Sequence, residues 1–276
     1  MMKQILLSCL FIFTIYQVSY AQDSIPSISN DTINATVDIA ENKESVNTKA
    51  VEAYNAADFR SAISLLEAEM EEQKAKELES ADLYYNLGNA HFRMNELAEA
   101  RLYYERALLL DPGDRDIRHN IEFLMTKIED KILVADTFFL SNWFTAVQNL
   151  FNSNDWANIA IGAFLLFMLC LVAFFFGRYV SMKKASFYMG IVSIVIVIFA
   201  NVFSYRQKAK VEYRDTAIVM TGSASVLSSP DMNSKEIFTL HAGTKVYITK
   251  EDRNWLEIEI DNGSIGWIQR EKIEII

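Results

Sequence analysis

Two long apolar stretches without a charged side chain interrupt an otherwise charge-rich chain of 276 residues. They cover residues 157–176 and 186–205, and each is 20 residues long. A helix of that length extends about 30 Å, which matches the hydrocarbon core of a bilayer. The pattern predicts two transmembrane helices joined by a short loop over residues 177–185.

The charges around these stretches and the N-terminus together predict which side of the membrane each part occupies. The loop carries Arg178, Lys183 and Lys184 but no acidic residue, which indicates a cytoplasmic position. Three cations after the second stretch favour the opposite orientation. Residues 1–21 combine a basic start, a short apolar run and small residues before Gln22, a pattern typical of a cleaved secretory signal peptide. An uncleaved anchor is the alternative. Because a signal peptide directs the adjoining domain out of the cytoplasm, we expect the N- and C-terminal domains to lie in the periplasm of a bacterial inner-membrane protein with two membrane passes.

Residues 22–42 are polar and are expected to form a disordered leader, whereas residues 43–130 have the apolar spacing of helices. The clearest unit, 81–114, has small residues where two antiparallel helices would cross, large residues around them and a closing proline. These are Tyr84, Leu87, Gly88, Ala100, Tyr104, Ala107, Leu108 and Pro112. The spacing resembles the tetratricopeptide repeat. A weaker copy covers about 46–80, and an amphipathic helix over 115–130 is the expected polar cap of the array.

The segment 131–156 carries an aromatic stripe at helical spacing. Its residues are Phe139, Trp143, Phe144, Val147, Leu150 and Phe151. One interpretation is an interfacial segment that lies in the headgroup region of the lipid bilayer. The other is an ordinary amphipathic helix packed on the repeats.

Residues 211–276 change to the alternating pattern of strands, seen in 244–249 and 255–260 and followed by a tight Asp-Asn-Gly turn. With Ser228-Ser229-Pro230, Gly243-Thr244 and Gly266-Trp267-Ile268, this tail resembles the bacterial SH3-like domain. Leu227 departs from the arginine that many relatives have there. The predicted fold class is a multidomain membrane protein with an all-α tetratricopeptide repeat array, a two-helix transmembrane hairpin and a small all-β SH3-like barrel.

Charge and cysteine content exclude several functions. Residues 22–130 hold 23 acidic and 11 basic side chains, which argues against nucleic acid as a partner, because phosphate binding needs clustered Lys and Arg. The two cysteines, Cys9 and Cys170, both lie in apolar runs. Once the signal peptide is removed, the domains outside the bilayer have no thiol for a disulfide, for thiol catalysis or for redox chemistry.

The sequence contains no catalytic constellation that we recognise. Its three histidines, His91, His119 and His241, lie on different elements, and none has a second ligand one helical turn away. We expect His91 to pack in the repeat core. Nucleotide-binding and hydrolase motifs are missing, and glycine is sparse. The chain is therefore predicted to be no enzyme and to use no metal or cofactor.

The candidate binding residues lie on the two predicted domains. In the second repeat, Tyr85, Asn89, Phe92 and Arg93 occupy positions that line the concave groove in the repeat family, where they would hold a peptide. The alternative is that they contact the neighbouring domain. In the tail, Trp255 and Trp267 form either an aromatic ligand face or, as is more frequent, part of the barrel core.

The order of parts resembles a member of the Bat (Bacteroides aerotolerance) proteins, together with the run Tyr84–Asn89 and the helix start Asp116-Ile117 with Asn120. The resemblance implies a scaffold for other Bat membrane proteins, which include von Willebrand A domain proteins, in aerotolerance or envelope stress resistance. The alternative function is a cell-wall sensor that binds peptidoglycan through the SH3-like tail.

Overall fold

The computed structural model describes residues 48–132 and 138–276. The predicted signal peptide, the predicted leader and residues 133–137 of the predicted interfacial segment lie outside the described residues. Residues Lys49–Ile276 form one compact unit.

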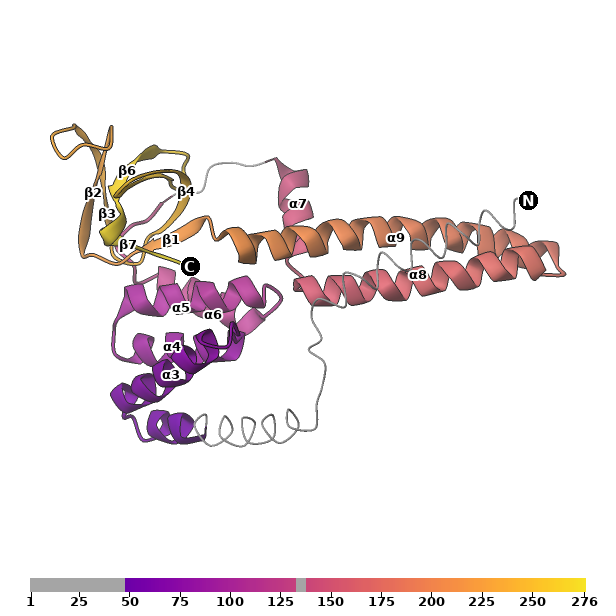
Figure 1. The fold of residues 1–276 in the computed structure, drawn as a ribbon, viewed down its shortest axis with the longest axis horizontal. Helices are drawn as coiled ribbons and strands as arrows, with labels where there is room; N and C mark the ends of the chain where they lie inside the picture. Colours follow the sequence, from indigo (N-terminus) through magenta and orange to yellow (C-terminus); the bar gives the residue numbers. More distant parts are fainter. Residues whose placement is uncertain (1–47, 133–137) are drawn as a thin grey trace. The chain divides into compact units, whose positions relative to one another are not determined.

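The repeat region is a stack of helices (Figure 1). A helix over residues 48–55 is followed by α3 (Phe59–Lys74), α4 (Ala81–Arg93), α5 (Leu97–Leu110) and α6 (Arg115–Met125). Each of α3, α4 and α6 begins after a polar residue whose side chain accepts a hydrogen bond from a backbone N–H of the first turn; these residues are Asp58, Ser80 and Asp114. Such caps satisfy donors that the helix itself leaves free. The cap predicted over 115–130 is shorter as a helix, although Ile128 beyond its end is still buried in the repeat core.

Close packing of α4 on α5 depends on Gly88. An added Cβ at Gly88 would lie 2.5 Å from Cδ1 of Tyr104, whose ring is 2% exposed. Leu87 and Ala107 are fully buried around this crossing. The small and large residues of the repeat pattern therefore allow the close contact between α4 and α5 that their spacing predicts.

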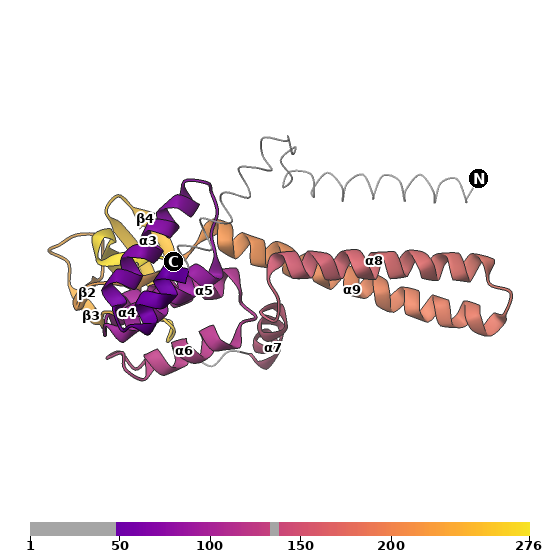
Figure 2. The same cartoon turned by 90° about the horizontal axis from the view of Figure 1, so that it is seen from below.

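The apolar stretches form α8 (Ser153–Phe176) and α9 (Val180–Tyr213), which lie side by side in both views (Figure 1 and Figure 2). Only residues 177–179 connect them, so Lys183 and Lys184 of the predicted loop lie in the first turns of α9. Gly177 ends α8, where an added Cβ would lie 2.5 Å from the Ala173 carbonyl oxygen. The following residues contain no proline or glycine up to Gly190, and the helix resumes at once.

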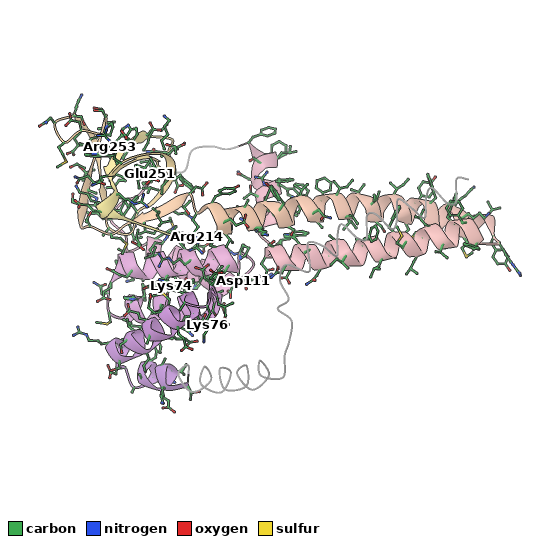
Figure 3. All side chains as sticks on the ribbon, viewed as in Figure 1. Lys74, Lys76, Asp111, Arg214, Glu251 and Arg253 are labelled. Atoms are coloured by element: carbon green, nitrogen blue, oxygen red, sulfur yellow. The ribbon has the colours of Figure 1, made fainter. Side chains whose placement is uncertain are left out.

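Small residues of α9 face α8 and allow the two helices to approach closely. The buried positions Gly190, Ser193, Val197 and Ala200 recur every three or four residues. An added Cβ at Gly190 would lie 3.7 Å from the Cβ of Cys170 on α8. Larger apolar side chains project away from the pair along both helices (Figure 3).

The tail is a seven-stranded antiparallel sheet with the strand order β3-β2-β6-β5-β4-β1-β7. Its strands are β1 (Thr216–Val219), β2 (Ser223–Leu227), β3 (Glu236–His241), β4 (Lys245–Asp252), β5 (Trp255–Glu259), β6 (Ile265–Gln269) and β7 (Ile273–Ile275), and the 3-10 helix η1 (Arg270–Lys272) precedes β7. Leu240 of β3 and Ile273 of β7 share one core cluster, although these strands stand at opposite ends of the order. The sheet must therefore curve so that one face becomes the interior.

The sheet contacts the repeats through α5, and a buried charge lies in this contact. Glu105 accepts a hydrogen bond from Lys245 of β4 at 2.7 Å and forms an ion pair with Arg101 at 2.6 Å. Burial by itself would raise the pKa of Glu105, but the charges of Lys245 and Arg101 hold it below its ordinary value. Beside this group, Leu102 of α5 packs with Ile218 and Ile276 in an apolar cluster.

A second contact joins the segment after α6 to the turn between β3 and β4. Asp130 accepts hydrogen bonds from the backbone N–H and Nδ1 of His241 and from the hydroxyl of Thr244. Burial opposes the charge of Asp130, but these donors hold its pKa below 3.8. The hydrogen bond to Asp130 raises the pKa of His241 above 6.5. The two contacts fix the sheet against the repeats.

We predict that Gly88→Ala destabilises the protein. The gain in helix propensity of about 1 kcal/mol is smaller than the cost of overpacking a buried ring, about 1–3 kcal/mol. Thermal unfolding of the full chain in detergent, followed by circular dichroism, should show a lower midpoint. Gly162→Ala is the matched control, because no atom lies within 4 Å of the added Cβ. Equal midpoints for the two variants would contradict the packing role of Gly88.

The contact between Asp130 and His241 predicts a dependence of stability on pH. The raised pKa of His241 means that its contribution is complete below pH 6.5 and is lost as the pH rises through the raised value. The lowered pKa of Asp130 means that its contribution is present above pH 3.8 and is lost as the pH falls. Unfolding midpoints should therefore decrease from pH 6 to pH 8 more in the wild type than in Asp130→Asn. Parallel profiles would show that the pair contributes nothing.

Candidate functional site

The inner face of α4 carries a hydrogen-bonded network that includes two of the predicted groove residues. Oδ1 of Asn89 accepts hydrogen bonds from the Tyr104 hydroxyl at 2.7 Å and from Nδ2 of Asn120 at 3.0 Å. Nδ2 of Asn120 also donates to the Tyr85 hydroxyl at 3.1 Å. Burial raises the pKa of Tyr104, so its hydroxyl stays protonated and remains a donor. This network connects α4, α5 and α6 and fixes the groove residues in place.

The other two predicted groove residues take part in aromatic contacts. The ring of Phe92 lies 5.8 Å from the ring of Phe123 on α6, and the Arg93 guanidinium lies 5.2 Å above the ring of Phe59 on α3. Arg93 is exposed, and half of the Phe123 side chain surface is exposed. The surface formed by Tyr85, Asn89, Phe92, Arg93, Asn120 and Phe123 is called the α4–α6 surface below.

The sheet domain makes its contacts on other parts of the repeats. Its hydrogen bonds and ion pairs with the described repeat residues involve Glu105, Arg106, Glu129 and Asp130, together with the apolar cluster around Leu102. Arg106 donates to the Ile275 carbonyl oxygen at 2.6 Å and to Glu274 at 3.0 Å. Within residues 48–132 and 138–276, no hydrogen bond, ion pair or aromatic contact joins the α4–α6 surface to the sheet.

Sequence reasoning missed Asn120 and Phe123. Phe123 lies on the face of α6 that was expected to be the outer, polar end of the array, whereas Asn120 points to α4. The signal was present in Phe123, a large apolar residue on a face otherwise occupied by polar side chains such as Glu122 and His119.

The tryptophans of the tail lie on the outer face of the sheet. Trp255 pairs with Gln269 and Glu257 pairs with Trp267, which places these four side chains on one face. Leu256, Ile258 and Ile268 point to the opposite face and are buried in the core. Both tryptophans are half-buried, and they lie on the face of the sheet opposite to the buried core residues. Exposed Met232 is adjacent, because Gln269 Nε2 lies 3.1 Å from its sulfur.

The three histidines lie in different surroundings. His91 is buried, stacks on Tyr103 with centroids 5.2 Å apart and contacts Glu96 through Nδ1 at 2.7 Å. His241 contacts Asp130, and His119 is exposed on α6. Among the described residues, no group of three or more His, Cys, Asp or Glu side chains could hold a metal ion.

Comparison with known protein families agrees with the two domain types. Residues 81–114 match the tetratricopeptide repeat, and residues 222–274 match the bacterial SH3 domain. No curated protein matches the chain. The predicted repeat and the predicted SH3-like tail are thereby confirmed. The chain joins a tetratricopeptide repeat to a bacterial SH3 domain, and both are typically interaction domains without catalytic activity.

Proposed function

We propose that this protein is a scaffold anchored in a bacterial inner membrane, with its repeats and SH3 domain in the periplasm. The anchoring is supported by α8 and α9. Both helices are strongly apolar, and only 6% and 28% of their most apolar segments is buried within the protein. Helices this apolar and this exposed need another apolar environment, which a bilayer supplies.

The observation that carries the scaffold function is the open α4–α6 surface. It combines aromatic rings, amide groups and a guanidinium, which can bury the side chains of a peptide and hydrogen-bond its backbone. The outer face of α5 is occupied by the sheet domain. A partner therefore has access to the groove side of the repeats.

The fixed contact between repeats and sheet favours binding of a partner that touches both. Because the two domains do not have to be oriented during association, less entropy is lost on binding. Anchoring in the same membrane as the partner raises its effective concentration. The resemblance to the Bat proteins suggests that the partners are other Bat membrane proteins, including those with von Willebrand A domains. The complex would support aerotolerance or envelope stress resistance.

The scaffold function predicts that Arg93→Ala/Phe123→Ala loses its partner. If the two contacts together contribute about 2 kcal/mol to binding, their loss weakens the affinity about thirtyfold. Co-purification from membranes in mild detergent, followed by identification and quantification of the bound Bat proteins, measures this. Asn89 is left intact in this variant, because its removal would leave the buried Tyr104 hydroxyl without its acceptor.

The matched control is Lys74→Ala/Leu78→Ala, which removes an exposed cation and an exposed apolar residue outside the α4–α6 surface (Lys74 is labelled in Figure 3). Its partner recovery should equal that of the wild type. Unchanged recovery with Arg93→Ala/Phe123→Ala would contradict groove binding.

The second candidate function is a cell-wall sensor, and the outward position of Trp255 and Trp267 favours it. Two partly exposed rings on neighbouring strands, with Gln269 and Glu257 beside them, form an aromatic surface with polar groups that suits a ligand such as a peptidoglycan peptide. In this function the SH3 domain binds the wall while α8 and α9 hold the protein in the membrane.

If the sensor function is correct, the detergent-solubilised full chain sediments with purified peptidoglycan sacculi, and Trp255→Ala/Trp267→Ala stays in the supernatant. Tyr213→Ala removes an exposed aromatic residue outside the SH3 domain and should sediment like the wild type. A wild-type chain that remains soluble in the presence of sacculi would exclude this function.

A further inference from the structure

The helix α7 (Phe139–Gln148) has a broader apolar face than its contacts with the rest of the protein require. At 3.6 residues per turn, its apolar side chains gather on one side of the helix; they are Phe139, Leu140, Trp143, Phe144 and Val147. Its polar side chains gather on the other side; they are Ser141, Asn142, Thr145 and Asn149.

One half of the apolar face packs on the polar end of the helix hairpin. The ring of Phe144 lies 4.8 Å from the ring of Phe203 on α9, and Val147 joins the cluster around Trp156. Gln207 Nε2 donates to the carbonyl oxygen of Gln148 at 3.0 Å, and Trp156 Nε1 donates to the same oxygen at 2.9 Å. These contacts hold α7 at one level of the hairpin. The aromatic stripe thus packs on the hairpin, whereas the predicted alternative had it packing on the repeats.

The other half of the apolar face is open. Phe139, Leu140 and Trp143 are 70%, 51% and 65% exposed. No charged residue occurs in residues 138–154. Three adjacent large apolar side chains on an uncharged helix indicate a surface that is covered in the working protein.

The position of α7 along the helix hairpin indicates what covers this surface. Phe203 belongs to the apolar part of α9, and Arg206, one turn later, is the first charged residue after that apolar part. α7 therefore contacts α9 where the helix leaves the apolar region, and Figure 1 shows it running across the direction of α9. At this boundary of a bilayer, aromatic residues are favoured.

Cations lie beside α7 at the same level. The Arg206 guanidinium is 5.4 Å from the centroid of the Phe144 ring, and Lys210 Nζ donates to Oδ1 of Asn149 at 3.1 Å. Positive charge next to an uncharged aromatic helix is complementary to the phosphate groups of phospholipids.

We propose that α7 lies in the interfacial layer of the bilayer, with Phe139, Leu140 and Trp143 inserted between phospholipids. The proposal rests on the membrane anchoring by α8 and α9 proposed above. It gives the protein a third attachment to the membrane. The turn between α5 and α6 touches the segment just after α7, since an added Cβ at Gly113 would lie 2.5 Å from the Leu150 carbonyl oxygen. The depth of α7 thus sets the distance between the repeats and the lipid surface.

The test uses spin labels in the full chain, reconstituted in phospholipid vesicles with or without anionic lipid. In a background with Cys9→Ala and Cys170→Ala, a single cysteine replaces Trp143, Ser141 or Leu165. Trp143 and Ser141 are both exposed on α7 but on opposite faces, so they are matched positions. Leu165 is exposed in the middle of α8 and reports insertion of the hairpin independently. Collision with oxygen, which concentrates in lipid, is compared with collision with a water-soluble nickel chelate.

We expect oxygen collisions to dominate at position 165, an intermediate depth at position 143 and nickel collisions to dominate at position 141. A label at position 143 that collides mainly with nickel, while position 165 is in lipid, would overturn the proposal and leave the anchoring intact. Protection of position 143 from both reagents would show that protein covers the face and would overturn it as well. A label at position 165 in water would overturn the anchoring itself. A deeper position 143 in anionic vesicles would support the role of Arg206 and Lys210.

Discussion

The buried carboxylate of Glu105 determines how the two halves of this protein are joined. Its charge is kept away from water because Arg101 on the same helix and Lys245 of the sheet both contact it. A buried ion pair adds little net stability, since desolvation offsets attraction, whereas loss of one partner costs about 3–5 kcal/mol. We infer that this group selects one arrangement of repeats and sheet, the one in which Lys245 reaches the carboxylate.

This arrangement decides which surfaces a partner can reach. The sheet occupies the outer face of α5, so the α4–α6 surface on the opposite side of the repeats stays open. The sheet in turn contacts the repeats through β1, β4, β7 and the turn between β3 and β4, while Trp255 and Trp267 stand on β5 and β6. The interface between repeats and sheet therefore leaves both candidate binding surfaces free. Two free binding surfaces are consistent with a protein that binds partners rather than one that catalyses a reaction.

The hairpin adds a constraint of a different kind. Along most of α8 and α9 the surface is apolar and uncovered, and polar contacts gather only near the end that leads to the domains, in the pairs Gln148 with Gln207 and Ser153 with Ser204. At this end α7 is attached and the turn between α5 and α6 approaches it. The place where the hairpin becomes polar is thus also the place where the domains are connected to it.

Periodicity in the sequence determined the local structure. The repeat over 81–114, the strands of the tail and the two apolar helices follow from it, because spacing of apolar residues directly reflects helix and strand geometry. The tertiary structure alone decided the rest. Alternation of apolar and polar residues assigns side chains to the two faces of a strand but does not say which face becomes the interior of the barrel. The outward position of Trp255 and Trp267 could therefore be found only from the curvature of the sheet. Likewise, Glu105 meets Lys245 across 140 residues of sequence, and Asn120 completes the network of Asn89 from a different helix. Such contacts depend on how elements pack in space, which no local pattern encodes.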